Sequence, residues 1–343
     1  MAADGYRVGV LGATGLVGST ILELLAARQF PAAEVVPLAS ARSAGKEIEW
    51  NGSVLTCLEV GDDSIQGLDL VLSSAGGSVS AEWAPKMVEA GAVVVDNTSH
   101  FRMRDDVPLV VSEVNPEALA GHNGIIANPN CSTMQMVVAL KPLYDAAGIE
   151  RLVVSTYQAV SGTGKAAIDE LMDQSHAILH GQPASASIYP HQIAFNPLAQ
   201  AGSFADGDDH TDEERKLINE TRKILGDEEI EVSATCIRVP VVTGHSEAVN
   251  VQTREPLSAD RARELLAAAP GVTVVDDPAN SRFPMAIEAA GKDDVFVGRI
   301  REDASHASTL DMWVVADNLR KGAATNAVQV AELLVERNLL RRS

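Results

Sequence analysis

The sequence is poor in cysteine, and this shortage limits the kinds of site that it can build. The 343 residues include three cysteines, Cys57, Cys131 and Cys236, which are widely spaced and form no C-x-x-C motif. An odd number at wide spacing fits neither a disulfide framework nor a zinc knuckle. We therefore expect no metal site and a reducing, cytoplasmic location.

Basic residues are also scarce. Lysine and arginine together number 27 against 47 aspartates and glutamates, which gives a formal net charge of -20. Phosphate backbones and anionic membranes repel such a chain, so we expect neither a nucleic-acid nor a membrane partner. A small anionic substrate is still possible, because a pocket needs only a few cations. No apolar run approaches the ~18 residues of a membrane span, and we expect no secretory leader.

Apolar residues, in contrast, are abundant at 46%, and the length suggests two domains. In the first 130 residues, short aliphatic runs alternate with helical stretches. We expect strands at 7–11, 35–39, 68–73 and 92–96, and helices at 19–28 and 81–90. This alternation predicts an α/β fold, a Rossmann-type parallel sheet that binds ligands at the carboxyl ends of its strands.

From Cys131 on, the strands are longer and lack a helix between each pair. We expect helices at 132–147, 165–180 and 324–340, and strands at 151–158, 231–240, 248–254, 295–302 and 309–316. This pattern predicts an α+β domain with a mixed or antiparallel sheet. The acidic segment 204–231 has helical spacing, which is typical of a solvated helix face.

The glycine-rich sequence GATGLVG at residues 12–18 lies between a predicted strand and a predicted helix. Glycine lets the backbone turn tightly and approach a pyrophosphate, and the helix N-terminus supplies free N–H groups. After the second strand, Ser40, Arg42 and Ser43 stand where an acidic residue would bind the ribose of NAD. Hydroxyls and a guanidinium suit a 2′-phosphate, so the sequence favours NADP.

Cys131 lies in the motif NPNCST, directly before a predicted helix. The positive end of a helix dipole favours a thiolate, the form that a covalent nucleophile requires. We interpret Cys57 and Cys236 as small buried thiols.

A nucleophilic thiol needs a partner for proton transfer, and His245 in RVPVVTGHSE is the leading histidine. An imidazole can act as acid or base near neutral pH, and Arg238 of the same motif can bind a carboxylate. From the residues alone, a surface or capping role for His245 is equally compatible. We interpret His176 and His180, four residues apart, as structural.

These motifs, in this order, resemble the aspartate-β-semialdehyde dehydrogenases over nearly the whole chain. The resemblance rests on GATGLVG, SHFRM at 99–103, NPNCST, QAVSGTGKAA at 158–167, the Glu213/Lys216 pair and RVPVVTGHSE. It is closer to the actinobacterial or Gram-positive type than to the enterobacterial one. The chain departs from the family after Asn196, where it reads PLAQAG, and this leaves the local loop uncertain.

The resemblance implies a role for each matching residue. Cys131 would be the acyl-accepting thiol, His245 the acid–base catalyst, and Gln158 would orient the acyl group. The residues that would bind substrate are Arg238 at the α-carboxylate, Glu213 at the amino group, Arg102 and Lys216 at the phosphate, and Asn130. Those that would contact NADP are Gly12, Thr14, Gly15, Leu16, Val17, Ser40, Arg42, Ser43, Ser74, Ala75, Gly76, Ser161, Gly162 and Asn326.

The resemblance also implies the domain limits and the reaction. An NADP-binding domain would span 1–130 and about 324–343, and a catalytic and dimerisation domain 131–323. The enzyme would be a homodimer or tetramer that reduces L-aspartyl-4-phosphate reversibly to L-aspartate-4-semialdehyde and phosphate. Two alternatives stay open: an enzyme like N-acetyl-γ-glutamyl-phosphate reductase, and a catalytically silent NADP-binding paralogue.

Overall fold

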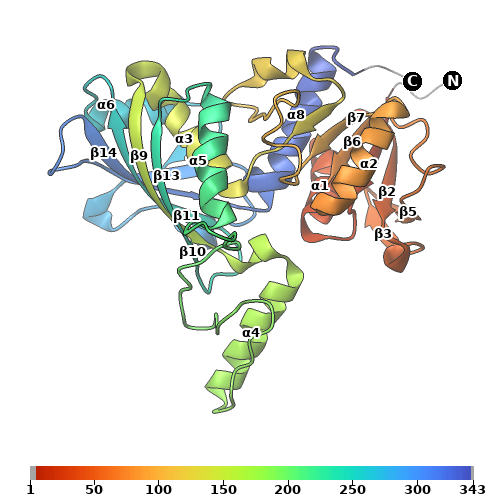
Figure 1. The fold of residues 1–343 in the computed structure, drawn as a ribbon, viewed down its shortest axis with the longest axis horizontal. Helices are drawn as coiled ribbons and strands as arrows, with labels where there is room; N and C mark the ends of the chain where they lie inside the picture. Colours follow the sequence, from red (N-terminus) through yellow and green to blue (C-terminus); the bar gives the residue numbers. More distant parts are fainter. Residues whose placement is uncertain (1–4, 341–343) are drawn as a thin grey trace. The chain divides into compact units, whose positions relative to one another are not determined.

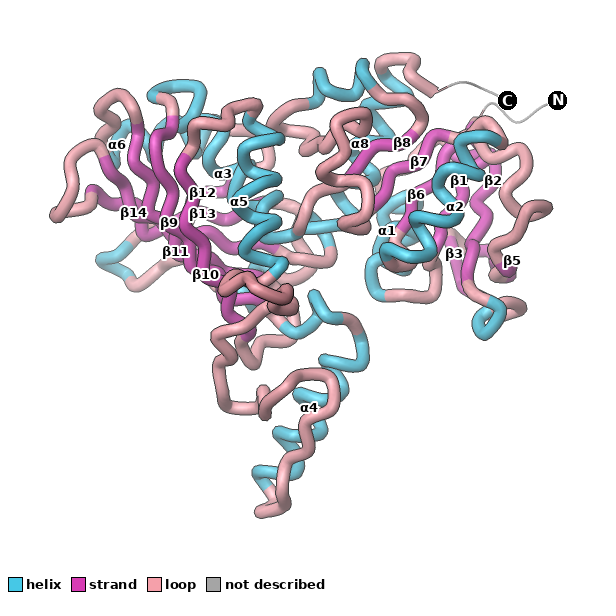
Figure 2. The backbone as a smooth tube through the Cα atoms, viewed as in Figure 1, coloured by secondary structure: helices cyan, strands magenta, loops and turns pink. Residues whose placement is uncertain are grey.

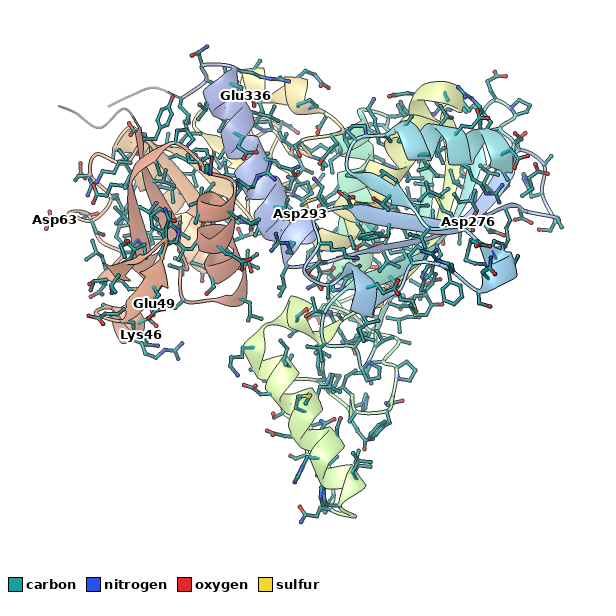
Figure 3. All side chains as sticks on the ribbon, turned by 180° about the vertical axis from the view of Figure 1, so that it is seen from behind. Lys46, Glu49, Asp63, Asp276, Asp293 and Glu336 are labelled. Carbon is teal, nitrogen blue, oxygen red and sulfur yellow. The ribbon has the colours of Figure 1, made fainter. Side chains whose placement is uncertain are left out.

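The computed structural model describes residues 5–340 and divides into two compact units, each with its own sheet. The first takes the chain up to Asn130 and again from Ala323 on, and the second is Cys131–Gly322. Exposed charged side chains such as Lys46, Glu49 and Asp63 stand on the outside of the first unit (Figure 3).

The first unit contains the predicted parallel sheet. Its strands, magenta in Figure 2, lie in the order β5-β2-β1-β6-β7-β8. Every neighbouring pair is parallel. This is the doubly wound order, third-second-first-fourth-fifth-sixth, with its switch point between β1 and β6. The predicted fold class is therefore confirmed. The bounds are β1 (Tyr6–Leu11), β2 (Ala32–Ala39), β5 (Leu58–Glu59), β6 (Leu70–Ser73), β7 (Val93–Asp96) and β8 (Ile125–Ala127).

Three helices pack on this sheet: α1 (Leu16–Ala27), α2 (Gly77–Glu89) and α8 (Thr325–Glu336). Helices α1 and α8 pack on one another and share a core with β1, β6 and β7. The C-terminal helix thus rejoins the N-terminal unit. Helix α1 begins three residues before its predicted start, because Gly15 is its N-cap. The hairpin of β3 (Glu47–Trp50) and β4 (Ser53–Thr56) was not predicted.

The second unit is built on the predicted mixed sheet, in the order β10-β9-β11-β14-β13-β12. The two outer pairs are parallel, and the three inner pairs are antiparallel. The bounds are β9 (Ile149–Gln158), β10 (Glu231–Arg238), β11 (His245–Thr253), β12 (Val272–Val274), β13 (Val295–Glu302) and β14 (Thr309–Ala316).

Helices cover this sheet and also extend from it. Helix α3 packs on β9, β11, β13 and β14, α5 packs on α3 and β10, and α6 packs on β12 and β13. Helix α4 and the chain that follows it project away from the sheet (Figure 1). The bounds are α3 (Cys131–Ala147), α4 (Lys165–Leu179), α5 (Asp212–Leu225), α6 (Ala259–Ala268) and α7 (Ala286–Ala289).

Helix α5 corrects one expectation for the acidic segment. Its face is not wholly solvated, because Glu214 and Glu220 are buried. Glu214 completes a capping box with Thr211, and its other oxygen accepts a hydrogen bond from the Cys236 N–H of β10. Glu214 therefore caps the start of the helix and attaches it to the sheet. Among residues 5–340, no helix has the length and apolar character of a membrane span.

Candidate active site and dinucleotide site

The glycine loop lies at the switch point of the first sheet. Gly12 follows β1 with φ of +85°, and a Cβ there would lie 2.6 Å from the Ser74 carbonyl oxygen after β6. A Cβ on Gly18 would lie 2.1 Å from the Gly12 oxygen. Gly15 is the N-cap of α1 and has no side chain to accept hydrogen bonds from the N–H groups of the first turn. The loop therefore fits a pyrophosphate.

The chain after β2 carries the predicted 2′-phosphate group of residues. A short 3₁₀ turn, Ala41–Ser43, follows Ser40. Arg42 is exposed and forms no ion pair with any residue of the described chain, while Ser43 is buried. No carboxylate stands at the end of β2 to bind a ribose hydroxyl, which agrees with the preference for NADP.

The other predicted cofactor residues of this unit differ in their surroundings. Thr14, Leu16, Val17, Ala75 and Gly76 are at least partly exposed around the glycine loop and the start of α2.

Asn326 is buried, and its amide is already used within the unit. The amide nitrogen donates to Val110 O and Asn128 Oδ1, and the oxygen accepts from the Ser112 N–H. Its contact with NADP stays a prediction.

Arg102 and Asn130, predicted to bind substrate, are both buried in this unit. The Arg102 guanidinium donates to the carbonyl oxygens of Asn128, at 2.9 Å, and Asn97, at 2.7 Å. These bonds fix the orientation of the guanidinium plane.

Cys131 is the first residue of α3, so the helix begins one residue before its predicted start and the cysteine lies in its first turn. It is partly exposed, whereas Cys57 and Cys236 are buried, and burial raises the pKa of both buried thiols. Gly322 packs so closely on Cys131 that an added Cβ would lie 2.8 Å from the Cys131 Cβ. Cys131 is therefore the accessible cysteine, at a helix N-terminus that favours its thiolate.

His245 is the first residue of β11 and is fully buried. The Ala159 N–H donates to Nδ1 over 3.0 Å, so a neutral ring carries its proton on Nε2. Nε2 is buried and has no hydrogen-bond partner among residues 5–340. Burial, together with the positive charge of Arg238, holds the pKa of His245 well below its usual range. The ring is thus a neutral Nε2–H donor at neutral pH.

Arg238 ends β10 beside His245. Its Nη1 donates to the Ala159 carbonyl oxygen over 2.8 Å, so one peptide orients both side chains. The Arg238 Nε is buried without a partner, and the guanidinium forms no ion pair with any residue among 5–340. A buried guanidinium with an unused donor is suited to bind an anion from outside the protein.

A cavity of about 410 Å³ opens at this arginine. Gly162 also lines the cavity and lies against His245 and Arg238: a Cβ there would lie 3.2 Å from His245 Nε2 and from Arg238 Nη1. The cavity is therefore large enough for a short amino-acid derivative and offers charges of both signs. Its lining comprises Gly162, Thr163, Ile188, Tyr189, Pro190, Gln200, Gly202, Ser203, Glu213 and Arg238.

The first turn of α5 supplies Glu213 and Lys216. The Lys216 ammonium contacts Glu213 Oε1 at 2.9 Å and Asp212 Oδ2 at 2.5 Å. Burial opposes the charge on Lys216, but the two carboxylates raise its pKa above the ordinary value. Lys216 is therefore a cation that pairs with Glu213, a residue of the cavity lining.

Gln158 and Ser161 complete the predicted residues of this unit. Gln158 is buried at the end of β9, directly opposite Arg238 in the sheet register, and its amide donates to Thr156 Oγ1. Ser161 pairs with Asn318, whose side chain also accepts the Gly244 N–H. The structure thus brings together Gln158, Ser161, Gly162, Arg238 and His245.

Three side chains around this site escaped the sequence analysis. Tyr189 lines the cavity and donates to Thr163 over 3.0 Å. Gln135 lies one helical turn beyond Cys131 and donates to the His245 carbonyl oxygen, and Glu247 lies two residues beyond His245 on the same strand. The sequence does hold signals for two of them: Gln135 is four residues from Cys131 on a predicted helix, and Glu247 is two residues from His245.

Comparison with known proteins places this geometry in a family. The model "Semialdehyde dehydrogenase, NAD binding domain" matches residues 7–122, and "Semialdehyde dehydrogenase, dimerisation domain" matches residues 140–321. An aspartate-semialdehyde dehydrogenase of Aquifex aeolicus is 55% identical over 98% of this chain and 100% of its own length. Another, of Legionella pneumophila, is 56% identical over 98% of both chains.

Solved structures of aspartate semialdehyde dehydrogenases share the fold of this chain. The crystal structure of aspartate semialdehyde dehydrogenase II from Vibrio cholerae, complexed with ASA, has a TM-score of 0.93 at 51% identity. It covers 97% of this chain and 98% of its own. An aspartate semialdehyde dehydrogenase from Candida albicans with NADP has a TM-score of 0.74 at 28% identity, over 98% of this chain and 100% of its own.

Proposed function

The chain belongs to the aspartate-semialdehyde dehydrogenase family, and from this premise we propose which of its residues carry out each step. Its activity is the NADP-dependent, reversible reductive dephosphorylation of L-aspartyl-4-phosphate to L-aspartate-4-semialdehyde, in the aspartate pathway of amino-acid biosynthesis. The observation that carries the assignment of residues is the buried Arg238. This guanidinium has an unused donor and no counter-ion among the described residues, and it stands beside the buried His245.

We assign the nucleophile to Cys131. Its thiolate attacks the acyl carbon of the aspartyl phosphate, a C–S bond forms, and the C–O bond to phosphate breaks. The resulting thioester divides one difficult reduction into two easier steps. NADPH, when bound, supplies the hydride that reduces this thioester.

We assign His245, the acid–base catalyst that the resemblance implies, to the oxygen of the reacting carbonyl. Because Ala159 occupies Nδ1, the Nε2–H is the group that can donate. It hydrogen-bonds the oxyanion that develops as the carbonyl carbon becomes tetrahedral. When the oxyanion collapses, the C–S bond breaks, the aldehyde leaves and the Cys131 thiolate returns. Gln158 orients the acyl group, as the resemblance implies.

The charged ends of the substrate are assigned to the cavity. Arg238 binds the α-carboxylate through its unused donor, and Glu213 faces the amino group. These two anchors would fix the only reactive carbonyl of a four-carbon amino acid. Lys216 of the same unit and Arg102 of the other unit are assigned to the phosphate, and Asn130 to the substrate.

The residues that would hold NADP follow from the glycine loop of the first unit. Gly12, Thr14, Gly15, Leu16 and Val17 take the pyrophosphate, Ser40, Arg42 and Ser43 the 2′-phosphate, and Ser74, Ala75 and Gly76 line the neighbouring loop. For Ser161, Gly162 and Asn326 the proposal rests on the resemblance.

The domain roles and the assembly are proposals of the same kind. NADP binding is assigned to residues 1–130 and about 324–343, and catalysis and dimerisation to 131–323. A cytoplasmic homodimer fits the family's dimerisation model. The actinobacterial or Gram-positive type rests on the motifs alone, since Aquifex aeolicus and Legionella pneumophila, the sources of the two relatives described first, are other kinds of bacteria.

The test is the rate of NADPH formation from L-aspartate-4-semialdehyde and NADP⁺, with and without inorganic phosphate. We expect phosphate-dependent turnover that is lost in Cys131→Ala. The N-acetylated glutamate semialdehyde, supplied in parallel, should give little turnover. Preference for that longer substrate would overturn the substrate assignment, and a folded wild type without any turnover would overturn the assignment of residues.

A further inference from the structure

Asn318 is a buried amide just after the last strand of the second sheet, and the proposed chemistry gives it no role. It stands two residues beyond β14 and is 3% exposed. Its Oδ1 accepts the Gly244 N–H over 2.9 Å, and its Nδ2 donates to Ser161 Oγ over 2.9 Å. The Ser161 hydroxyl in turn donates to Oδ1 over 3.2 Å. Because a backbone N–H can only donate, the Gly244 bond settles which end of the amide is the oxygen.

The bond from Gly244 holds the chain that leads into His245. Gly244 directly precedes His245, and its φ of +98° lies in the left-handed region, which glycine adopts without strain. A Cβ at Gly244 would lie 2.9 Å from the Ala286 carbonyl oxygen, so the backbone is closely packed at this turn. The Asn318 oxygen accepts the N–H of the turn, and the backbone of His245 continues from this fixed point.

The bonds with Ser161 hold the loop that lies against the His245 ring. Ser161 directly precedes Gly162, where a Cβ would lie 3.2 Å from His245 Cε1 and Nε2. The same loop is also tied to the chain before His245, because the Ser161 N–H donates to the Val242 carbonyl oxygen over 3.1 Å. One side-chain amide therefore joins the two loops that contact His245.

The chain after Asn318 reaches the nucleophile. The Gly322 N–H donates back to the Asp317 carbonyl oxygen over 3.1 Å, which closes a wide helical turn that includes Asn318. A Cβ on Gly322 would lie 2.8 Å from the Cys131 Cβ and 3.6 Å from the Asn318 Cβ. Cys131 and Asn318 thus both lie next to the same glycine.

We propose that Asn318 is a positioning residue that fixes the His245 ring with respect to the Cys131 thiol. Its amide holds the chain before His245 and the loop against the ring, and its backbone turn carries the glycine that packs on Cys131. Asn318 acts through these groups rather than on the substrate. Its effect on the rate rests on the roles proposed above for Cys131 and His245, whereas its hydrogen bonds do not depend on them.

Removal of the amide should disturb the histidine and spare the thiol. Asn318→Ala keeps the Cβ that lies near Gly322, so the packing of Gly322 on Cys131 should persist. The same change leaves the Gly244 N–H and the Ser161 hydroxyl without their buried partner. Buried polar groups without partners are costly, so both loops should shift to find new ones.

The consequence for kinetics is specific. A displacement on the order of 1 Å at a reacting group lowers the rate by up to about 100-fold, so a shift of His245 should lower kcat. The KM for the semialdehyde should change little, because Arg238 and Glu213 are the residues assigned to the charged ends of the substrate.

Three variants of Asn318 and one control test this role. Asn318→Ala and Asn318→Leu both remove the hydrogen bonds, and leucine also fills the volume of the amide. We expect kcat to fall by about 10- to 100-fold in each, with a KM within about threefold of wild type. Asn318→Asp keeps an oxygen for the Gly244 N–H, and we expect a kcat within about fivefold of wild type. Asn250→Ala, the control, removes two side-chain hydrogen bonds in the same sheet and should lower the melting temperature without loss of kcat.

Two further measurements need no turnover. The rate at which iodoacetamide alkylates Cys131 should stay within about twofold of wild type in Asn318→Ala. In protein labelled with ¹⁵N-histidine, the ring signals of His245, identified by their loss in His245→Gln, should shift in Asn318→Ala and Asn318→Leu but not in Asn250→Ala.

Several results would overturn the proposal. These are a wild-type kcat or unshifted His245 signals in either folded variant, Asn318→Ala or Asn318→Leu, and a kcat for Asn318→Asp as low as that of Asn318→Ala. An alkylation rate that falls as far as kcat would do so too, because the disturbance would then include the thiol. A folded wild type without turnover would overturn the proposed function instead, and the His245 signals would still decide whether Asn318 positions the ring.

Discussion

Replacing Gly162 with alanine probes whether the catalytic groups converge as described. An added Cβ would lie 3.2 Å from His245 Cε1, His245 Nε2 and Arg238 Nη1. Ordinary van der Waals contact begins near 3.4 Å, so one or both side chains must move by a few tenths of an ångström. His245 has little room to move, since it is fully buried and bound by the Ala159 N–H.

We expect kcat/KM to fall by about 10- to 100-fold, equivalent to about 1.4–2.7 kcal/mol of transition-state stabilisation. The fold should persist, because the φ of Gly162 is outside the left-handed region and alanine restricts the unfolded chain. The assay is the initial rate of NADPH formation with L-aspartate-4-semialdehyde and phosphate, alongside a thermal melt. Gly61→Ala is the control, since its added Cβ would meet nothing within 4 Å. If Gly162→Ala keeps the kcat/KM of the wild type, the close approach of His245 and Arg238 to Gly162 is refuted.

Three further changes test separate parts of the account. Arg238→Lys loses the buried Nε donor, so steady-state kinetics should show the KM for the semialdehyde rising about tenfold or more; an unchanged KM would contradict carboxylate binding there. Burial raises the pKa of Glu247, so the folded protein retains a proton that the unfolded chain releases above about pH 5, and Glu247→Gln should become more stable than wild type by up to ~1.4 kcal/mol per pH unit. A stability difference in denaturant melts that does not change with pH would count against this. Burial opposes the charge on Glu170, but hydrogen bonds from Ile188 and Ser187 lower its pKa. Glu170→Gln should therefore lower the free energy of unfolding by about 1–3 kcal/mol at neutral pH and by progressively less as the pH falls below about 4.5, and an equal loss at low pH would refute the role of the charge.

The sequence predicts four of the six strands of the first sheet, β1, β2, β6 and β7, because most of their residues are buried. The short strands β5 and β8 were not predicted. Runs such as 68–73 (LDLVLS) and 92–96 (AVVVD) are mostly aliphatic, as their burial in a parallel sheet requires. The β3–β4 hairpin was missed because its residues are largely exposed and carry no continuous apolar run. Short, solvated strands depend on pairing that a local pattern does not reveal.

The site shows a different limit. Strand β11 was predicted to begin at Ala248, but it begins at His245, since His245, Ser246 and Glu247 are polar residues in a buried strand. Hydrophobic periodicity fails where a strand carries functional side chains. Cys131 and His245 were found through their motifs, whereas Gln135 and Glu247 became visible only when α3 and β11 were packed together.

The central claim is that Cys131 forms a covalent acyl-enzyme, and a rapid-mixing experiment without phosphate tests it most directly. The enzyme is mixed with L-aspartate-4-semialdehyde and NADP⁺, NADPH is followed by absorbance, and the acyl adduct is mapped by mass spectrometry. We predict a burst of about one NADPH per active site, an aspartyl adduct on the peptide that contains Cys131, and neither signal in Cys131→Ala. A burst that persists in Cys131→Ala, or an adduct on another residue, would contradict the account.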